Sequence, residues 1–187
     1  MVALTSLWLP VLVSAILVFL ASSVIHMALG YHNSDYRKLP KEDDILAALG
    51  PIGIPPGDYF LPWAGGMAGM KDPVFQAKWQ RGPIATLTVM PAGVNFMGSQ
   101  LVQWFVYAAV VAFFAGYVAS RTIAPGTDYL IVFRVVGTTA FMGYALGLWQ
   151  MTIWYRRSVT TTLKSSLDGL IYAGLTAGAF GWLWPAA

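Results

Sequence analysis

Four long apolar segments dominate the chain and constrain its fold more than any other feature. They cover about residues 7–29, 99–120, 128–155 and 167–184. Each approaches or exceeds the roughly 20 residues that a helix needs to cross the ~30 Å hydrocarbon core of a bilayer. Backbone polar groups in hydrocarbon must be satisfied within such a segment, which favours helices. The sequence therefore predicts an all-α membrane protein with four transmembrane helices in a single membrane domain, 1–187.

The composition excludes several classes of function. Hydrophobic residues make up 57% of the chain and charged residues 10%, whereas a soluble domain carries about 25% charged residues. The absence of cysteine removes disulfides, thiolate metal sites and cysteine nucleophiles. A net charge of +3 is too small to form a nucleic-acid-binding face. The HExxH, GxGxxG and GxSxG motifs are also missing, so we predict no catalytic residues and a non-enzymatic protein.

The positions of the basic residues predict the topology. Nine of the eleven Lys and Arg residues lie in the connections after the first and third segments: Arg37, Lys38, Lys41, Lys71, Lys78, Arg81, Arg156, Arg157 and Lys164. Cytoplasmic loops carry such an excess of positive charge. We therefore expect both termini outside the cytoplasm and the long connection of residues 31–98 inside it.

That connection has the composition of an ordered element. Two short helices are predicted within it, Pro40–Leu49 and Pro73–Arg81, each followed by a Gly-Pro pair. Asp72 is placed to cap the second helix. Residues 85–90 (ATLTVM) alternate as a strand does but show no partner, so we expect extended chain and no sheet.

Small residues spaced by four mark the helix faces that approach closely in membranes. They are Ala108, Ala112, Gly116 and Ser120 in the second segment, Thr139, Gly143 and Gly147 in the third, and Gly174 and Gly178 in the fourth. These residues are interpreted as helix-packing positions within the chain or as an interface with another subunit.

His26 and His32 are the only histidines, and with Met67 and Met70 they are the candidate ligands for a haem or a metal ion. Their spacing argues against a shared site, because six helical residues correspond to about 600° of rotation and Gly30 is expected to end the helix between them. We therefore predict no metal and no cofactor. His26 is expected to bond to a neighbouring helix.

Two further charged residues lie in the apolar segments. Arg134 is expected near the outer edge of the membrane, where it contacts a lipid phosphate, backbone carbonyls or the carboxylate of Ala187, or reaches water. Asp168 is expected at the start of the fourth helix. There it complements the helix dipole, with Ser165 or Ser166 as the cap.

Several strings resemble a group of small bacterial membrane proteins of about this size without an assigned function. They are HNSDYRKLPKEDDILAAL, KDPVFQAKWQRGP, VMPAGVNFMG and DGLIYAGLTAGAFGWLWP. The resemblance implies a multi-pass protein of a bacterial inner membrane and supplies no catalytic residues.

Three functions remain open. The first is an accessory or assembly subunit that associates with itself or docks to a larger membrane complex. The second is a small oligomeric channel or transporter lined by Gln103, Thr138, Thr139 and Gln150. The third is a haem- or copper-binding redox subunit that uses the histidines and methionines.

Overall fold

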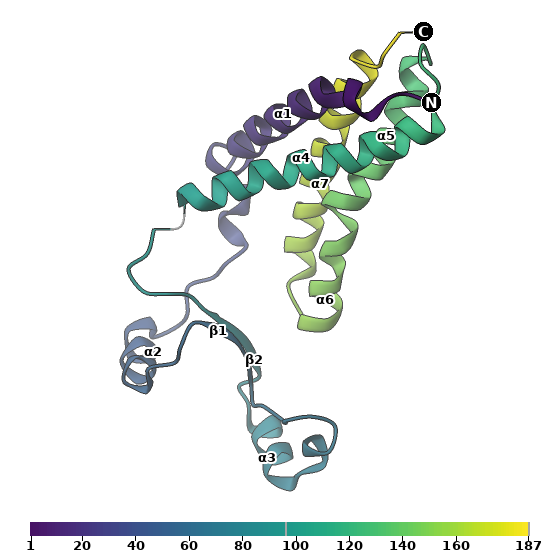
Figure 1. The fold of residues 1–187 in the computed structure, drawn as a ribbon. Coiled ribbons are helices and arrows are strands. Elements are labelled where there is room, and N and C mark those ends of the chain that lie inside the picture. Colours follow the sequence, from purple (N-terminus) through teal and green to yellow (C-terminus); the bar gives the residue numbers. More distant parts are fainter. Residues whose placement is uncertain (96, 187) are drawn as a thin grey trace. The chain divides into compact units, whose positions relative to one another are not determined.

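The computed structural model describes residues 1–95 and 97–186, and the chain divides into two compact units. Met1–Arg37 and Phe96–Ala187 form the helical unit, and Lys38–Asn95 form the connecting unit (Figure 1). The predicted helical character is confirmed, because most of the chain is α-helix.

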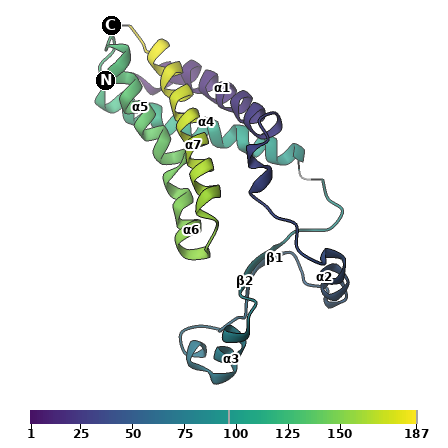
Figure 2. The same cartoon turned by 180° about the vertical axis from the view of Figure 1, so that it is seen from behind.

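The helical unit contains five helices and three short 3₁₀ turns among its described residues. The helices are α1 (Trp8–Met27), α4 (Met97–Thr122), α5 (Tyr129–Tyr144), α6 (Trp149–Tyr155) and α7 (Val159–Trp182). The 3₁₀ turns are Leu4–Leu7, Tyr31–Ser34 and Leu146–Leu148. Helices α5 and α7 run side by side, and α1 packs against both α7 and α4 (Figure 2).

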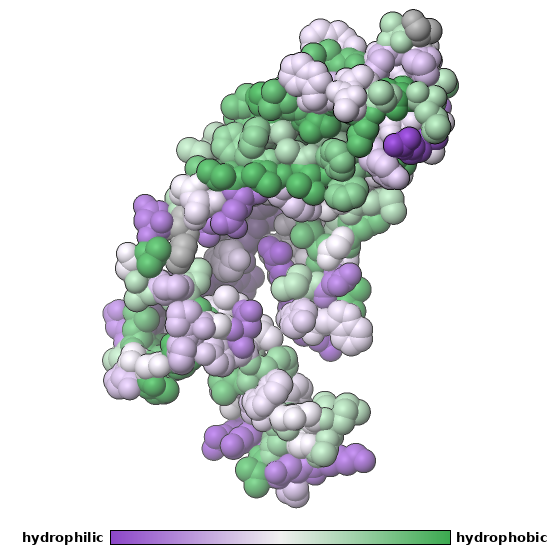
Figure 3. Space-filling view, in the orientation of Figure 1, coloured by the Kyte–Doolittle hydropathy of each residue, from purple (hydrophilic) through white to green (hydrophobic). Residues whose placement is uncertain are grey.

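Three helical segments of the described chain are long and apolar enough to cross a membrane: Leu4–Met27, Met97–Thr122 and Tyr129–Tyr155. They coincide with the first three predicted spans and are consistent with a membrane protein. Large apolar side chains such as Leu20, Val24 and Phe114 are exposed on their surfaces. Figure 3 shows apolar residues covering the visible face of α1 and α4, as lipid contact requires.

The third segment is not one continuous helix. Helix α5 ends at Tyr144, and a 3₁₀ turn at Leu146–Leu148 precedes α6. Gly143 lies in the last turn of α5 and Gly147 lies in the 3₁₀ turn. Glycine is a weak helix former, which explains why the helix breaks there.

Helix α7 begins at Val159, several residues before the predicted start near Leu167. The polar stretch before Leu167 is helical, and its hydroxyl groups bond both to α6, with the Thr162 and Thr152 hydroxyls 2.6 Å apart, and within α7. The Ser166 hydroxyl donates to the Thr162 carbonyl at 2.8 Å instead of capping a terminus. Asp168 consequently lies inside the helix, and its predicted role at the helix start was wrong.

The interior of the helical unit is filled by small residues and a few large ones. Fully buried side chains include Leu7, Val18, Ala112, Val132, Val136 and Phe180. Small residues on α4 allow neighbouring helices to approach closely, which is how membrane helices associate.

The connecting unit contains α2 (Glu42–Leu49), β1 (Gly57–Leu61), α3 (Pro73–Arg81) and β2 (Ala85–Val89). The two strands pair antiparallel, with Gly57 opposite Val89 and Leu61 opposite Ala85. The expectation of an unpaired extended segment was therefore wrong. Its partner strand has no alternating pattern, and the α3 segment separates the two strands in sequence, so no hairpin signal was visible.

Side-chain caps and backbone conformation define where three of the helices begin. The Asp72 carboxylate accepts from the Val74 amide at 2.7 Å, as predicted for the start of α3. Asp128 accepts from the Leu130 amide at 2.9 Å and caps α5 in the same way. The first short helix begins at Glu42 rather than Pro40, because Lys41 has a left-handed backbone conformation with φ of 53°.

Candidate metal centre

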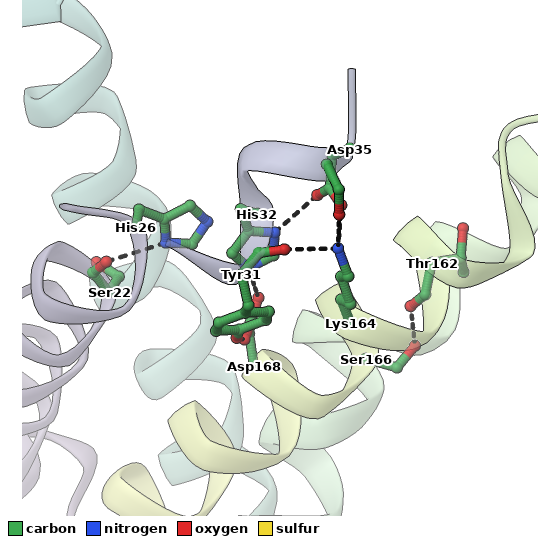
Figure 4. Close-up of polar contacts among 10 residues, drawn as sticks. Ser22, His26, Tyr31, His32, Asp35, Thr162, Lys164, Ser166 and Asp168 are labelled. Carbon is green, nitrogen blue, oxygen red and sulfur yellow. Dashed lines mark hydrogen bonds and ion pairs between the residues drawn. The ribbon is translucent and has the colours of Figure 1, made fainter. Parts of the chain in front are cut away.

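The candidate site forms where the chain leaves α1 and turns back against α7. Helix α1 ends at Met27, and Gly30 has a φ of 64°, a left-handed conformation that glycine adopts without strain. The 3₁₀ turn Tyr31–Ser34 follows at once. This turn carries Tyr31 and His32 to the side of α7 (Figure 4).

Asp168 is the buried centre of the site, with 3% of its surface exposed. The Tyr31 hydroxyl donates a hydrogen bond to one oxygen of the Asp168 carboxylate. The other oxygen lies 2.8 Å from Nε2 of His32. A carboxylate buried in the interior needs such partners, since an unpaired charge there costs several kcal/mol (on the order of 3–5).

Asp35 holds the other side of the His32 ring. Its carboxylate lies 2.7 Å from Nδ1 of His32 and 3.0 Å from Nζ of Lys164. Burial raises the pKa of Asp35, but the hydrogen bonds from His32 and Lys164 and their positive charge outweigh burial. The pKa therefore lies below its ordinary value of 3.8, and Asp35 is ionised at neutral pH.

Lys164 ties the turn to α7. Besides Asp35, its ammonium group donates to the Tyr31 carbonyl at 2.6 Å and to the Ser34 hydroxyl at 2.8 Å. An ammonium group has three donors, and all three are used. Lys164 thus fixes both the backbone of the 3₁₀ turn and the carboxylate that orients His32.

His26 stands at the end of α1 with its ring parallel to that of His32. The ring centroids are 4.5 Å apart and the planes differ by 4°. Nδ1 of His26 lies 3.0 Å from the Ser22 carbonyl oxygen. The second ring nitrogen lies on the side of the ring that faces His32 (Figure 4).

These contacts determine which ring nitrogens carry protons. A carbonyl oxygen and an ionised carboxylate only accept hydrogen bonds, so Nδ1 of His26 and Nδ1 of His32 must both be donors. Nε2 is then the nitrogen of each ring that a metal could bind once it carries no proton, and its orientation is set by the bond at Nδ1. Nε2 of His32 and the Asp168 oxygen lie 2.8 Å apart, a distance at which the two atoms share a proton, so a metal ion at Nε2 would have to displace that proton.

His26, His32 and Asp168 together offer three ligand atoms that all lie within 4.8 Å of one another. Two imidazole nitrogens and one carboxylate oxygen are a ligand set used by Zn²⁺ and by ferrous iron. Among the described residues, this is the one group of three metal-ligating side chains.

An aromatic cluster adjoins the site inside the helical unit. Trp104 donates from Nε1 to the Ser22 hydroxyl at 2.8 Å, and its ring contacts those of Tyr144 and Tyr172. Tyr172 lies one helical turn after Asp168, and its buried hydroxyl has no hydrogen-bond partner in the described part of the chain. Asp168 thus faces a largely apolar interior on this side.

The structure overturns the sequence argument against a shared histidine site. The 600° of rotation holds only if the helix continues from His26 to His32. Instead, α1 ends at Met27, and the left-handed Gly30 reverses the direction of the chain. The side chains therefore stack instead of diverging. Sequence reasoning also missed Asp35 and Lys164, although the His32–Asp35 spacing of three residues was a usable signal.

The other candidate residues lie elsewhere. Met67 and Met70 belong to the connecting unit, where they are 82% and 50% exposed. Arg134 is exposed on α5, and no ion pair involves it among residues 1–95 and 97–186. Ala187, one of its predicted partners, lies outside the described residues.

The small-residue positions divide into two sets. The four on α4 are buried inside the helical unit: Ala108, Ala112, Gly116 and Ser120. Thr139 is half-buried and its hydroxyl bonds to the Val135 carbonyl, while Gly143 faces Val111. Gly178 approaches Tyr129, whereas a Cβ at Gly147 or Gly174 meets no described atom within 4 Å.

The residues predicted to line a channel lie at or near the surface of the helical unit. Gln103, Thr138 and Gln150 are exposed, and Thr139 is half-buried. No protein-family model, curated protein or solved structure matches the chain, so the geometry of the site carries the functional argument.

Proposed function

We propose that this chain is a multi-pass membrane protein that binds a divalent first-row transition metal through His26, His32 and Asp168. The observation that carries the proposal is that His26, His32 and Asp168 offer three ligand atoms within 4.8 Å of one another. Ser22 and Asp35 accept from Nδ1 of the two rings, so Nε2 of His26 and Nε2 of His32, the latter 2.8 Å from the Asp168 carboxylate, are the nitrogens that a metal would bind. A histidine ligand in a metalloprotein usually donates its other nitrogen to a carbonyl or carboxylate in this way.

The ligand set selects among cations. Two imidazole nitrogens suit zinc, iron and copper, whereas magnesium and calcium take oxygen ligands. Parallel rings stacked 4.5 Å apart do not match a haem held between two histidines, because those rings lie on opposite faces of the macrocycle. Zinc and ferrous iron fit two histidines with one carboxylate best.

Metal binding requires only a small adjustment. Two ligand atoms that each lie about 2.1 Å from an ion are at most about 4.2 Å apart, and the candidate atoms lie within 4.8 Å. His26 is exposed, so its ring can tilt toward His32 at little cost. Asp168 and His32 are fixed by Tyr31 and Asp35, which keeps them in place for the ion.

The proposed membrane arrangement follows the charge pattern. Helix α7 acts as a fourth span, the protein lies in a bacterial inner membrane, and both termini face outward. The distribution of Lys and Arg supports this orientation. The metal site then lies near the cytoplasmic end of α1.

The test is a zinc titration of the full-length protein in mild detergent by equilibrium dialysis. We expect one Zn²⁺ per chain. His26→Ala and Asp168→Asn should each weaken binding at least about tenfold, as losses at metal sites generally do. His26→Ala is informative even if Asp168→Asn fails to fold, because the His26 side chain is exposed.

The matched control is Asp43→Asn, which removes an exposed carboxylate from α2 and should bind zinc as wild type does. Circular dichroism verifies that each variant keeps its helical content. The proposal is wrong if the wild-type protein binds no zinc, or if His26→Ala binds it with unchanged affinity.

The metal site is compatible with an accessory role in a larger membrane complex. No described atom lies within 4 Å of a Cβ placed at Gly147 or Gly174, which leaves room there for a helix of another subunit to pack closely. Blue-native electrophoresis of solubilised native membranes tests this role. A single band at the monomer mass in mild detergent would contradict it.

A further inference from the structure

Almost no residue of the connecting unit is buried. Among residues 38–95, all of which are described, Pro62 is the only buried one. Two strands form its sheet, and an isolated two-stranded hairpin is only marginally stable in water. The unit therefore needs a surface that covers its exposed apolar side chains.

The two most exposed large apolar side chains of the connecting unit, Met67 and Trp63, lie in the segment between the two strands, residues 62–84, here named the α3 lobe. Trp63 is 76% exposed, Met67 82% and Val74 61%. The rings of Phe60 and Trp79 stack with centroids 6.2 Å apart, so β1 packs on α3. Exposed apolar groups of this size usually mark an interaction surface.

Basic residues accompany this apolar surface. The α3 lobe carries Lys71, Lys78 and Arg81 against a single acidic residue, Asp72, a net charge of 3 − 1 = +2. Val74, Lys78 and Arg81 recur at spacings of four and three, which places them on one face of α3. The Asp72 carboxylate is engaged with the Val74 amide at the helix start.

The position of the α3 lobe between two candidate membrane-spanning helices indicates that its partner is the membrane surface. The connecting unit follows α1 and precedes α4, and both helices are long and apolar enough to span a membrane. The chain therefore connects to a candidate membrane-spanning helix on each side of the unit. Tryptophan and basic side chains are the residues that settle at the level of anionic headgroups.

We infer that the α3 lobe docks on the anionic lipid headgroups of the membrane that the chain itself crosses. Trp63, Met67 and Val74 enter the interface, and Lys71, Lys78 and Arg81 contact lipid phosphates. Each basic residue near an anionic surface strengthens such binding by about fivefold. The inference requires membrane-spanning helices but is independent of the metal site.

The chain has no cysteine, so a single introduced cysteine can carry a fluorophore. The full-length Met67→Cys protein is labelled with an environment-sensitive dye and reconstituted into phosphatidylcholine vesicles with and without phosphatidylglycerol. Lipids with a spin-label quencher near the headgroup report insertion from either leaflet. Asp43→Cys on α2 is the matched control.

With phosphatidylglycerol present, the dye at residue 67 should shift to shorter wavelength and be quenched by the labelled lipid. The control dye should show neither effect. Combining Met67→Cys with Lys78→Gln and Arg81→Gln removes two exposed charges and should reduce the quenching severalfold. Zinc binding should be unchanged in every labelled protein that keeps the metal site.

Three outcomes would overturn the inference. The dye at residue 67 could stay open to an aqueous quencher in anionic vesicles. It could be shielded equally in detergent micelles, which would mean that protein covers the lobe. Shielding that is the same in neutral vesicles and in the charge variant would show that anionic headgroups are not the partner.

Discussion

Gly116 on α4 faces Phe180 so closely that a single methyl group should overfill the helical unit. A Cβ at this position would lie 2.8 Å from Cε1 and 2.9 Å from Cζ of Phe180, and 3.6 Å from Cδ1 of Leu7. Phe180 and Leu7 are fully buried, so neither side chain has room to move away. Gly116→Ala should therefore destabilise the folded protein.

The expected magnitude follows from two opposing effects. Alanine is a better helix former than glycine by about 1 kcal/mol. Inserting a methyl group into a packed core costs about 1–3 kcal/mol. Gly174→Ala gains the same helix propensity, but no described atom lies within 4 Å of its Cβ. Gly116→Ala should thus be less stable than Gly174→Ala by about 1–3 kcal/mol, the packing cost alone.

The assay is reversible unfolding of the purified protein in mixed micelles of mild detergent and sodium dodecyl sulfate, followed by circular dichroism. The free energy of unfolding is compared among wild type, Gly116→Ala and Gly174→Ala. Equal stability of the two variants would refute the packing argument. Loss of a self-associated form in Gly174→Ala alone would identify that face as a subunit interface.

Four further outcomes are expected. Trp104→Phe removes the 2.8 Å bond to the Ser22 hydroxyl and should cost about 0.6 kcal/mol, at most about 2, in the same unfolding assay. Asp35→Asn should weaken zinc binding by about 10- to 100-fold in the dialysis assay while the stoichiometry stays unchanged, since it removes the carboxylate that orients His32. The pKa of Asp35 is lower in the folded protein than its ordinary 3.8, so its ionised form stabilises the fold above that pH. The stability difference between wild type and Asp35→Asn should therefore shrink as the pH falls below 3.8, and a difference that grows would contradict this. Cysteine introduced at Ala186 should react with an impermeant maleimide in intact cells, whereas cysteine at Ala47 should react only after permeabilisation; the reverse pattern would place the connecting unit outside.

The sequence by itself determined the features that depend on neighbouring residues. Three apolar segments became helices long enough to span a membrane, because helical hydrogen bonds form within a segment and its apolar surface suits lipid. Asp72 caps α3 as predicted, because a cap bonds to an amide two residues away.

Structure that depends on contacts between residues far apart in the sequence could not be predicted from the sequence pattern. Strand β1 ends at Leu61, far before β2 begins at Ala85, and carries no alternation of its own, so its pairing was not visible. The start of α7 was misplaced because Ser166 satisfies its hydroxyl within the helix, where the polar composition had indicated a turn.

Only the tertiary structure assembled the candidate metal centre. His32 and Asp168 are 136 residues apart, and their contact depends on the backbone reversal at Gly30 and on the packing of α1 against α7. Periodicity along α1 predicted that the two histidines diverge. The rotation of a helix fixes side-chain directions only as far as the helix continues, and beyond Met27 the turn and the contacts of Lys164 and Asp35 decide where His32 points.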